Sequence, residues 1–313
     1  MEETTNTKGW VIGILVVIVV VLGGYMLFKG PSKTVVVNQE PTTTGNGTEN
    51  GNGTVATTTP TVVVNKAETV IGKSVEGRDV TAYHYGTGND EVLFIGGIHG
   101  GYEWNTTLLA YKLMDYLKTN RDAVPSNLKV TVIPVLNPDG LVKVVGTASG
   151  NFKYADVSPS VAVQISGRFN GNNVDLGRNF DCNWQTTGMW QNRKVSGGSA
   201  VFSEPESAAI KNYVETKNLK AVIVYYSAGD GAYSSACGAG VLPETGALTS
   251  LYAISAGYGS HAKFDAYPTT GDIVNWLAKI KIPAISVLLN NHTDIDWDQN
   301  LPGVKAVLAH YAK

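Results

Sequence analysis

The chain has 313 residues, of which 43% are hydrophobic and 16% are charged, and its formal net charge is −2. This is enough for one α/β domain of about 240 residues once the N-terminal segments are set aside. A near-neutral chain without a run of Lys or Arg lacks the basic surface that nucleic acid requires, so we expect no nucleic-acid partner.

The N-terminus contains the strongest hydrophobic segment. Residues 10–28 are uncharged and long enough to cross a bilayer as a helix. A cleaved signal peptide has a shorter apolar region and a small-residue cleavage site, and no such site follows Phe28. We therefore predict a short tail at residues 1–9 and an uncleaved transmembrane anchor at residues 10–28. The flanking charges hardly set its orientation. Because large domains translocate largely regardless of charge, we expect the C-terminal domain outside the cytoplasm.

A spacer separates this anchor from the globular part of the chain. Residues 29–66 are rich in Thr, Asn and Gly and contain few large apolar side chains. Such a segment buries too little surface to offset its ordering entropy. We therefore predict a flexible linker at residues 29–66 and a folded domain at residues 67–313.

The domain is expected to open with an antiparallel hairpin over residues 70–85, followed by a strand, a tight turn and a helix. Residues 92–95 form a short apolar run that glycines end, and apolar residues recur at helical spacing after Glu103. His99 and Glu103 therefore lie at the turn between strand and helix. Ligands bind at this edge of open α/β sheets, so the two side chains are either a pair of metal ligands or a structural contact.

Further strands and helices alternate along the rest of the chain. The predicted strands cover residues 129–136, 221–226 and 284–289, and the predicted helices cover residues 204–217, 247–258 and from about 302 onward. This alternation predicts a mixed, mostly parallel twisted sheet with helices on both faces.

Six short motifs occur in the order typical of one enzyme family. They are Ser74-Val-Glu-Gly-Arg78, Gly96-Gly-Ile-His99 with Glu103, Asn137-Pro-Asp-Gly140, Val174-Asp-Leu-Gly-Arg178-Asn-Phe180, Phe202-Ser-Glu-Pro-Glu206, and Tyr267 nine residues before Trp276. From about Val70 to its end, the chain resembles the zinc carboxypeptidase family, the carboxypeptidase A-like metallopeptidases.

The resemblance implies a zinc ion and assigns its first two ligands to His99 and Glu103. The family usually spaces these residues as His-x-x-Glu, whereas this chain has His-x-x-x-Glu. A helical register still places residues four apart on one side. In the family the metal lowers the pKa of its bound water to about 7, and a separate Glu takes the proton.

The resemblance also implies a site for a peptide C-terminus. Arg178 matches the arginine that binds the terminal carboxylate, and Gly177 replaces the Asn that usually precedes it. Arg168 matches the oxyanion-stabilising arginine, with a surface arginine as the alternative. Tyr267 matches the tyrosine that closes over the ligand, with a tyrosine at the core edge as the alternative. Val274 is expected to line an apolar specificity pocket.

Two positions depart from the family pattern. Tyr226 stands where the third zinc ligand, a His, is expected, and Leu288 stands where the general-base Glu is expected. Tyrosine is an uncommon zinc ligand, and leucine cannot accept a proton. Loss of the base alone costs on the order of 10² to 10⁴ in rate.

Two nearby residues could take over the role of the third zinc ligand or of the general base. Asp230 follows Tyr226 by four residues and His292 follows Leu288 by four, so either side chain could act as ligand or base; the alternative for His292 is a surface loop residue. The other histidines are expected to be ordinary surface residues: His84, His261 and His310.

The two cysteines, Cys182 and Cys237, have no zinc-finger or Cys-x-x-Cys spacing. They form either one disulfide or two buried thiols. The fold implied by the resemblance brings both near the rim of the site, and an extracytoplasmic location favours the disulfide.

The first hypothesis is a membrane-tethered domain that recognises peptide C-termini and has lost or strongly weakened hydrolysis. The second is an active zinc carboxypeptidase that cleaves peptides or cell-wall peptides with a rearranged site. A third, an amide hydrolase of the related acylase type, shares the turn motif but fits the later motifs less well.

Overall fold

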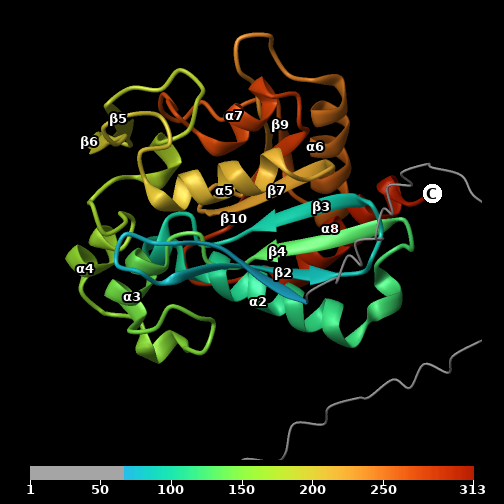
Figure 1. Cartoon of the computed structure of the whole chain (residues 1–313), viewed down its shortest axis with the longest axis horizontal. Coiled ribbons are helices and arrows are strands. Elements are labelled where there is room, and N and C mark those ends of the chain that lie inside the picture. Colours follow the sequence, from blue (N-terminus) through green and yellow to red (C-terminus); the bar gives the residue numbers. More distant parts are fainter. Residues whose placement is uncertain (1–66) are drawn as a thin grey trace, which may run out of the picture. The chain divides into compact units, whose positions relative to one another are not determined.

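A central β-sheet organises residues 67–313, the part of the chain that this computed structural model describes (Figure 1). The predicted tail, anchor at residues 10–28 and linker fall outside the described residues. Among the helices of residues 67–313, none has both the length and the apolar character that a bilayer crossing requires.

The main sheet has eight strands in the order β1-β2-β4-β3-β7-β10-β8-β9. Their bounds are Glu68–Lys73 for β1, Asp79–Tyr85 for β2, Asp90–Ile95 for β3, Leu128–Ile133 for β4, Leu219–Ser227 for β7, Gly231–Ser234 for β8, Gly259–His261 for β9 and Ala284–Leu289 for β10. The central strands β4, β3, β7 and β10 are mutually parallel, while the β1-β2, β2-β4 and β10-β8 pairs are antiparallel. This confirms the predicted mixed, mostly parallel sheet.

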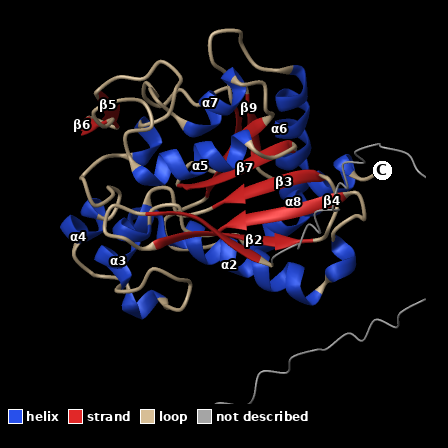
Figure 2. Cartoon of the chain, in the orientation of Figure 1, coloured by secondary structure: helices blue, strands red, loops and turns tan. Residues whose placement is uncertain are grey.

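Helices cover both faces of the sheet, as predicted (Figure 2). On one face lie α2 (Trp104–Thr119), α6 (Pro243–Ala256) and α8 (Trp297–Tyr311), and on the other lie α5 (Pro205–Glu215) and α7 (Ile273–Lys279). The short helices α3 (Pro138–Val145) and α4 (Val161–Ser166) follow β4 in the chain. A separate hairpin pairs β5 (Thr187–Trp190) with β6 (Arg193–Ser196).

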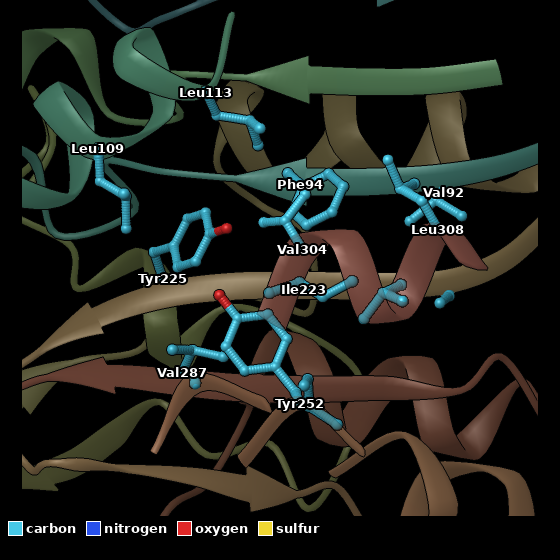
Figure 3. Packing of buried hydrophobic residues seen from close by; sticks show 14 of the residues in the cluster. Val92, Phe94, Leu109, Leu113, Ile223, Tyr225, Tyr252, Val287, Val304 and Leu308 are labelled. Atoms are coloured by element: carbon cyan, nitrogen blue, oxygen red, sulfur yellow. The ribbon is translucent and has the colours of Figure 1, made fainter. Parts of the chain in front are cut away.

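Successive side chains of the central strands point to opposite faces of the sheet, so the core consists of two layers. In β3, Val92 and Phe94 face α2, α6 and α8, whereas Leu93 and Ile95 face α5 and α7. Figure 3 shows the first layer, where Phe94 lies among side chains from strands and helices. Each fully buried side chain of this size contributes about 1.5–3 kcal/mol, so both faces anchor the strands whose ends build the site.

Several element boundaries differ from the prediction. The last helix begins at Trp297 rather than near Pro302, because the structure accommodates Pro302 inside the helix. The strand predicted to reach residue 136 ends at Ile133, directly before Pro134, which lacks the N–H that a ladder needs. Short elements were not predicted, because they span too few residues to show a clear hydrophobic period: α3, α4, α7, β5, β6, β8 and β9.

Candidate functional site

A cavity of about 600 Å³ lies at the carboxyl ends of the central parallel strands. The side chains that the family resemblance assigned to metal, substrate and catalysis all line it: His99, Glu103, Arg168, Arg178, Tyr226, Tyr267, Val274 and Leu288. The crevice at this edge is where open α/β sheets bind ligands.

His99 and Glu103 meet inside the turn between β3 and α2. His99 Nδ1 lies 2.9 Å from Glu103 Oε1, and His99 Nε2 lies 3.5 Å from Asp175 Oδ1. All three side chains are buried. In residues 67–313, neither His99 nitrogen nor Glu103 Oε2 has a well-aligned hydrogen-bond partner. The extra residue in the His-x-x-x-Glu turn therefore still leaves the two side chains together.

Gly177 creates the space that His99 occupies. A Cβ atom at Gly177 would lie 2.8 Å from His99 Nε2 and 3.3 Å from Asp175 Oδ1. Any larger residue would therefore require His99 to move. In this structure His99 therefore occupies the space that a side chain at position 177 would take.

Arg168 is buried rather than on the surface, so the alternative interpretation of this residue was wrong. Its side chain is 1% exposed, its Nε donates to Asp175 Oδ2 at 2.9 Å, and its guanidinium carbon lies 4.5 Å from the Trp190 ring centroid. Arg168 Nη1 also lies 3.9 Å from Glu103 Oε1. Burial alone would raise the pKa of Asp175, but Arg168 and His99 hold it well below its usual range. The sequence analysis did not single out Asp175 or Trp190.

Tyr226 and Leu288 are direct neighbours on β7 and β10, and both face the cavity. The Tyr226 ring centroid lies 5.3 Å from that of His99, and its hydroxyl lies 3.4 Å from Asp272 Oδ2. Burial raises the pKa of Tyr226 well above its ordinary value.

The side chains present do not fit a complete zinc site. Within residues 67–313, no three His, Cys, Asp or Glu side chains gather closely enough to hold a metal ion. His99 and Glu103 supply two donors, and the side chain nearest to them on β7 is the Tyr226 phenol, which lies beside Asp272. A catalytic zinc site normally needs three protein ligands and an open position.

The two proposed replacements occupy different environments. Asp230 is exposed and does not line the cavity. His292 does line it, half-buried against the Tyr102 ring at 4.8 Å, so the surface-loop interpretation of His292 was wrong. Burial lowers the pKa of His292. The remaining histidines lie outside the cavity lining: His84, His261 and His310.

Arg178 is a buried cation without a carboxylate beside it. Its side chain donates to the backbone oxygens of Met189, at 2.8 Å and 3.3 Å, and of Gly177, at 2.7 Å. Within the described part of the chain, no Asp or Glu oxygen lies within 4.0 Å of it. These bonds leave one N–H on each terminal nitrogen for a ligand. The Tyr267 ring centroid lies 5.7 Å from its guanidinium carbon.

The wall that carries Val274 is more polar than the sequence suggested. Val274 lines the cavity in the first turn of α7, as expected, but Asp272, Asn275 and Ser286 line it as well. Asp272 Oδ1 accepts from the Asn275 N–H and caps α7. Burial raises the pKa of Asp272. The expectation of an apolar specificity pocket therefore has to be corrected.

Cys182 and Cys237 form a disulfide in this structure, with their Cα atoms 6.0 Å apart. Cys182 lies four residues after Arg178, and Ala236, next to Cys237, lines the cavity. The bridge therefore ties together two segments near the Arg178 end of the cavity.

The fold of this domain resembles solved metallocarboxypeptidases. Bovine thrombin-activatable fibrinolysis inhibitor, in complex with tick carboxypeptidase inhibitor, superposes with a TM-score of 0.61 at 17% identity, covering 78% of this chain and 89% of that chain. Murein-tripeptide amidase from Escherichia coli O157 superposes with a TM-score of 0.55 at 17% identity, covering 79% of this chain and 93% of that chain. At these identities the likeness establishes the fold alone.

Curated relatives match shorter stretches. Gamma-D-glutamyl-L-diamino acid endopeptidase 1 of Lysinibacillus sphaericus is 25% identical over 184 residues, which is 53% of this chain and 46% of that protein. Human carboxypeptidase D is 29% identical over 123 residues, which is 35% of this chain and 8% of that protein. The chain thus spans less than half the length of these relatives.

The family model described as zinc carboxypeptidase matches residues 55–285, well over half of the sequence. The chain belongs to the zinc carboxypeptidase family.

Proposed function

We propose that this protein is a membrane-tethered, extracytoplasmic domain that recognises peptide C-termini and has lost or strongly weakened hydrolysis. The buried guanidinium of Arg178 carries the proposal. A buried charge is normally paired, and in residues 67–313 Arg178 has only carbonyl partners within hydrogen-bonding distance. Its two remaining N–H groups suit a planar carboxylate, and Tyr267 lies beside it to cover the ligand.

Weak hydrolysis follows from Tyr226 and Leu288, which lie side by side on the cavity floor. Tyr226 offers a phenol, which is an uncommon zinc ligand, and Leu288 offers no proton acceptor. His99 and Glu103 remain together without a third ligand. A scissile carbonyl would therefore be bound without the metal-activated water and base that the family's chemistry needs.

The names of similar proteins support a peptide ligand. One is a gamma-D-glutamyl-L-diamino acid endopeptidase, one is a murein-tripeptide amidase, and one is the catalytic chain of human carboxypeptidase N. The uncharged segment at residues 10–28 supports the tether, and the Cys182–Cys237 disulfide supports an oxidising compartment.

Calorimetric titration of the full chain with short peptides tests the proposal. Peptides with a free C-terminus should bind, and their amidated forms should bind on the order of 10- to 100-fold more weakly. Arg178→Ala should remove this difference, while Arg121→Ala, which changes an exposed arginine, should keep it. Equal binding of the free and amidated peptides to the unmodified chain would reject carboxylate recognition.

The second candidate is an active zinc peptidase with a rearranged site. The unpartnered atoms of His99 and Glu103 favour it, as does the position of His292 in the same cavity. This function predicts peptide hydrolysis that a chelator abolishes and added zinc restores. Hydrolysis that survives chelation unchanged would reject it.

A further inference from the structure

A short hairpin outside the main sheet contacts both buried arginines of the cavity. Its first strand, β5, pairs only with β6 within residues 67–313 (Figure 1). The backbone oxygen of Met189 accepts from Arg178 Nε at 3.3 Å and from Arg178 Nη2 at 2.8 Å. The next residue, Trp190, has its ring centroid 4.5 Å from the guanidinium carbon of Arg168. Neighbouring residues of one strand therefore each hold one arginine.

The Met189 oxygen determines which edge of Arg178 can meet a ligand. A guanidinium binds a carboxylate through two parallel N–H groups, either on the edge formed by Nε and Nη2 or on the edge formed by the two terminal nitrogens. Met189 occupies the first edge, and the backbone oxygen of Gly177 accepts from Nη1 at 2.7 Å. The edge between Nη1 and Nη2 is left open. β5 thus sets the direction from which a carboxylate can approach Arg178.

Gly188, the residue before Met189, lets β5 lie directly against the Arg178 side chain. A Cβ atom at position 188 would lie 2.8 Å from Arg178 Cδ and 3.2 Å from Arg178 Nε. Because buried side chains are closely packed, a larger residue at this position would displace the stem of Arg178. Three consecutive residues of β5 therefore contact the two arginines.

Trp190 anchors β5 through its side chain. It is 3% exposed, and its ring centroid lies 4.8 Å from that of Tyr102 and 6.4 Å from that of Phe169. Tyr102 belongs to the turn that carries Glu103, and Phe169 follows Arg168 in the chain. A buried tryptophan supplies a large contact area in a specific orientation. Because β5 lies outside the main sheet, we expect its position to depend on this ring.

We propose that β5 is a positioning strand for both arginines, with Trp190 as the positioning residue that anchors it. This inference rests on the proposed function, because it concerns how Arg178 is presented to a peptide carboxylate. Without the Trp190 ring, Met189 would not be held against Arg178, and the guanidinium would lose the orientation that leaves its terminal edge open. Recognition would weaken although both arginines remain, because binding would then have to order them.

Calorimetric titration of the full chain with free and amidated peptides tests the inference. Trp190→Leu should reduce the difference in affinity between the two peptides to less than about threefold, whereas Trp190→Phe, which keeps an aromatic face for Arg168, should keep most of it. Trp297→Leu is the control, because Trp297 is a half-buried tryptophan of α8 outside the cavity lining. It should lower stability but keep the full difference.

A second variant tests β5 without removing its anchor. Gly188→Ala should also reduce the difference between free and amidated peptides, because the added Cβ would push against Arg178 Cδ. Gly246→Ala in α6, whose nearest neighbour lies 3.9 Å away, should leave the difference unchanged.

The outcomes separate this inference from the proposed function. If free peptides bind the unmodified chain through Arg178 but folded Trp190→Leu keeps the full difference, the inference fails and the proposed function stands. An equal loss in Trp297→Leu would show that general destabilisation is the cause, and would also overturn the inference. If Trp190→Leu does not fold, an unchanged difference in Gly188→Ala overturns it. If no peptide with a free C-terminus binds the unmodified chain, the proposed function itself fails.

Discussion

The two ends of the cavity differ in the chemistry of their side chains. Around Arg178, a buried guanidinium, a neighbouring tyrosine and a buried carboxylate line the cavity. Around His99, the turn still presents His99 and Glu103, but the adjacent strand positions hold Tyr226 and Leu288. The strands fix the positions of these side chains whatever their chemistry is, so binding and catalysis can be altered independently within one fold.

The largest expected effect comes from restoring the hydrolytic end. Tyr226→His with Leu288→Glu should raise peptide hydrolysis by at least on the order of 10²-fold over the unmodified chain, because it supplies a third ligand and a base. The measurement is the rate of release of the C-terminal residue, with and without zinc.

The matched control is Tyr226→Phe with Leu288→Glu, which keeps the ring volume at position 226 but has no nitrogen donor. It should remain inactive. Equal activity of both double variants would show that the hydrolytic end was never limited by its third ligand.

The next largest effect concerns the Arg178 end of the cavity, near which the disulfide joins two segments. Cys182→Ser with Cys237→Ser should lower the free energy of unfolding by about 4 kcal/mol, because the bridge closes a long loop with a sequence separation of 55. Urea unfolding of the oxidised chain, the reduced chain and the variant provides the measurement. A reductant should destabilise the unmodified chain and leave the variant unchanged, and an unmodified chain indifferent to reductant would contradict the bridge.

The smallest expected effect concerns Gly177, which lies between Arg178 and the His99 side chain. Gly177→Ala should lower the free energy of unfolding by about 1–3 kcal/mol, because the added Cβ would meet His99 Nε2 at 2.8 Å. Gly246→Ala in α6 is the control, since its nearest neighbour lies 3.9 Å away and alanine favours helix. If both variants are equally stable, His99 does not occupy this space.

The sheet and most of the cavity lining could be predicted from sequence, because buried strands and ordered motifs are local signals. The strand at residues 284–289 was predicted with its observed bounds, and His99, Arg178 and Tyr226 all reach the cavity. Their placement depends on strand ends and turns that the motifs encode directly.

The polarity and charge balance of the site could not be predicted, because they depend on contacts between distant segments. Asp272 was not singled out, since a single Asp before a helix is ordinarily a cap. Asp175 was missed because its role arises only from its distances to Arg168 and His99. His292 was assigned to the surface, since its loop gives no sign of packing against Tyr102.

The metal content of the purified full chain, after equilibration with a small excess of zinc at neutral pH, is the most direct test of the proposed loss of hydrolysis. We expect far less than one zinc per chain, because no three His, Cys, Asp or Glu side chains gather around a metal position in residues 67–313, and we expect Tyr226→His to approach one. A stoichiometry near one in the unmodified chain would show that a third ligand exists among its own residues and would contradict the account.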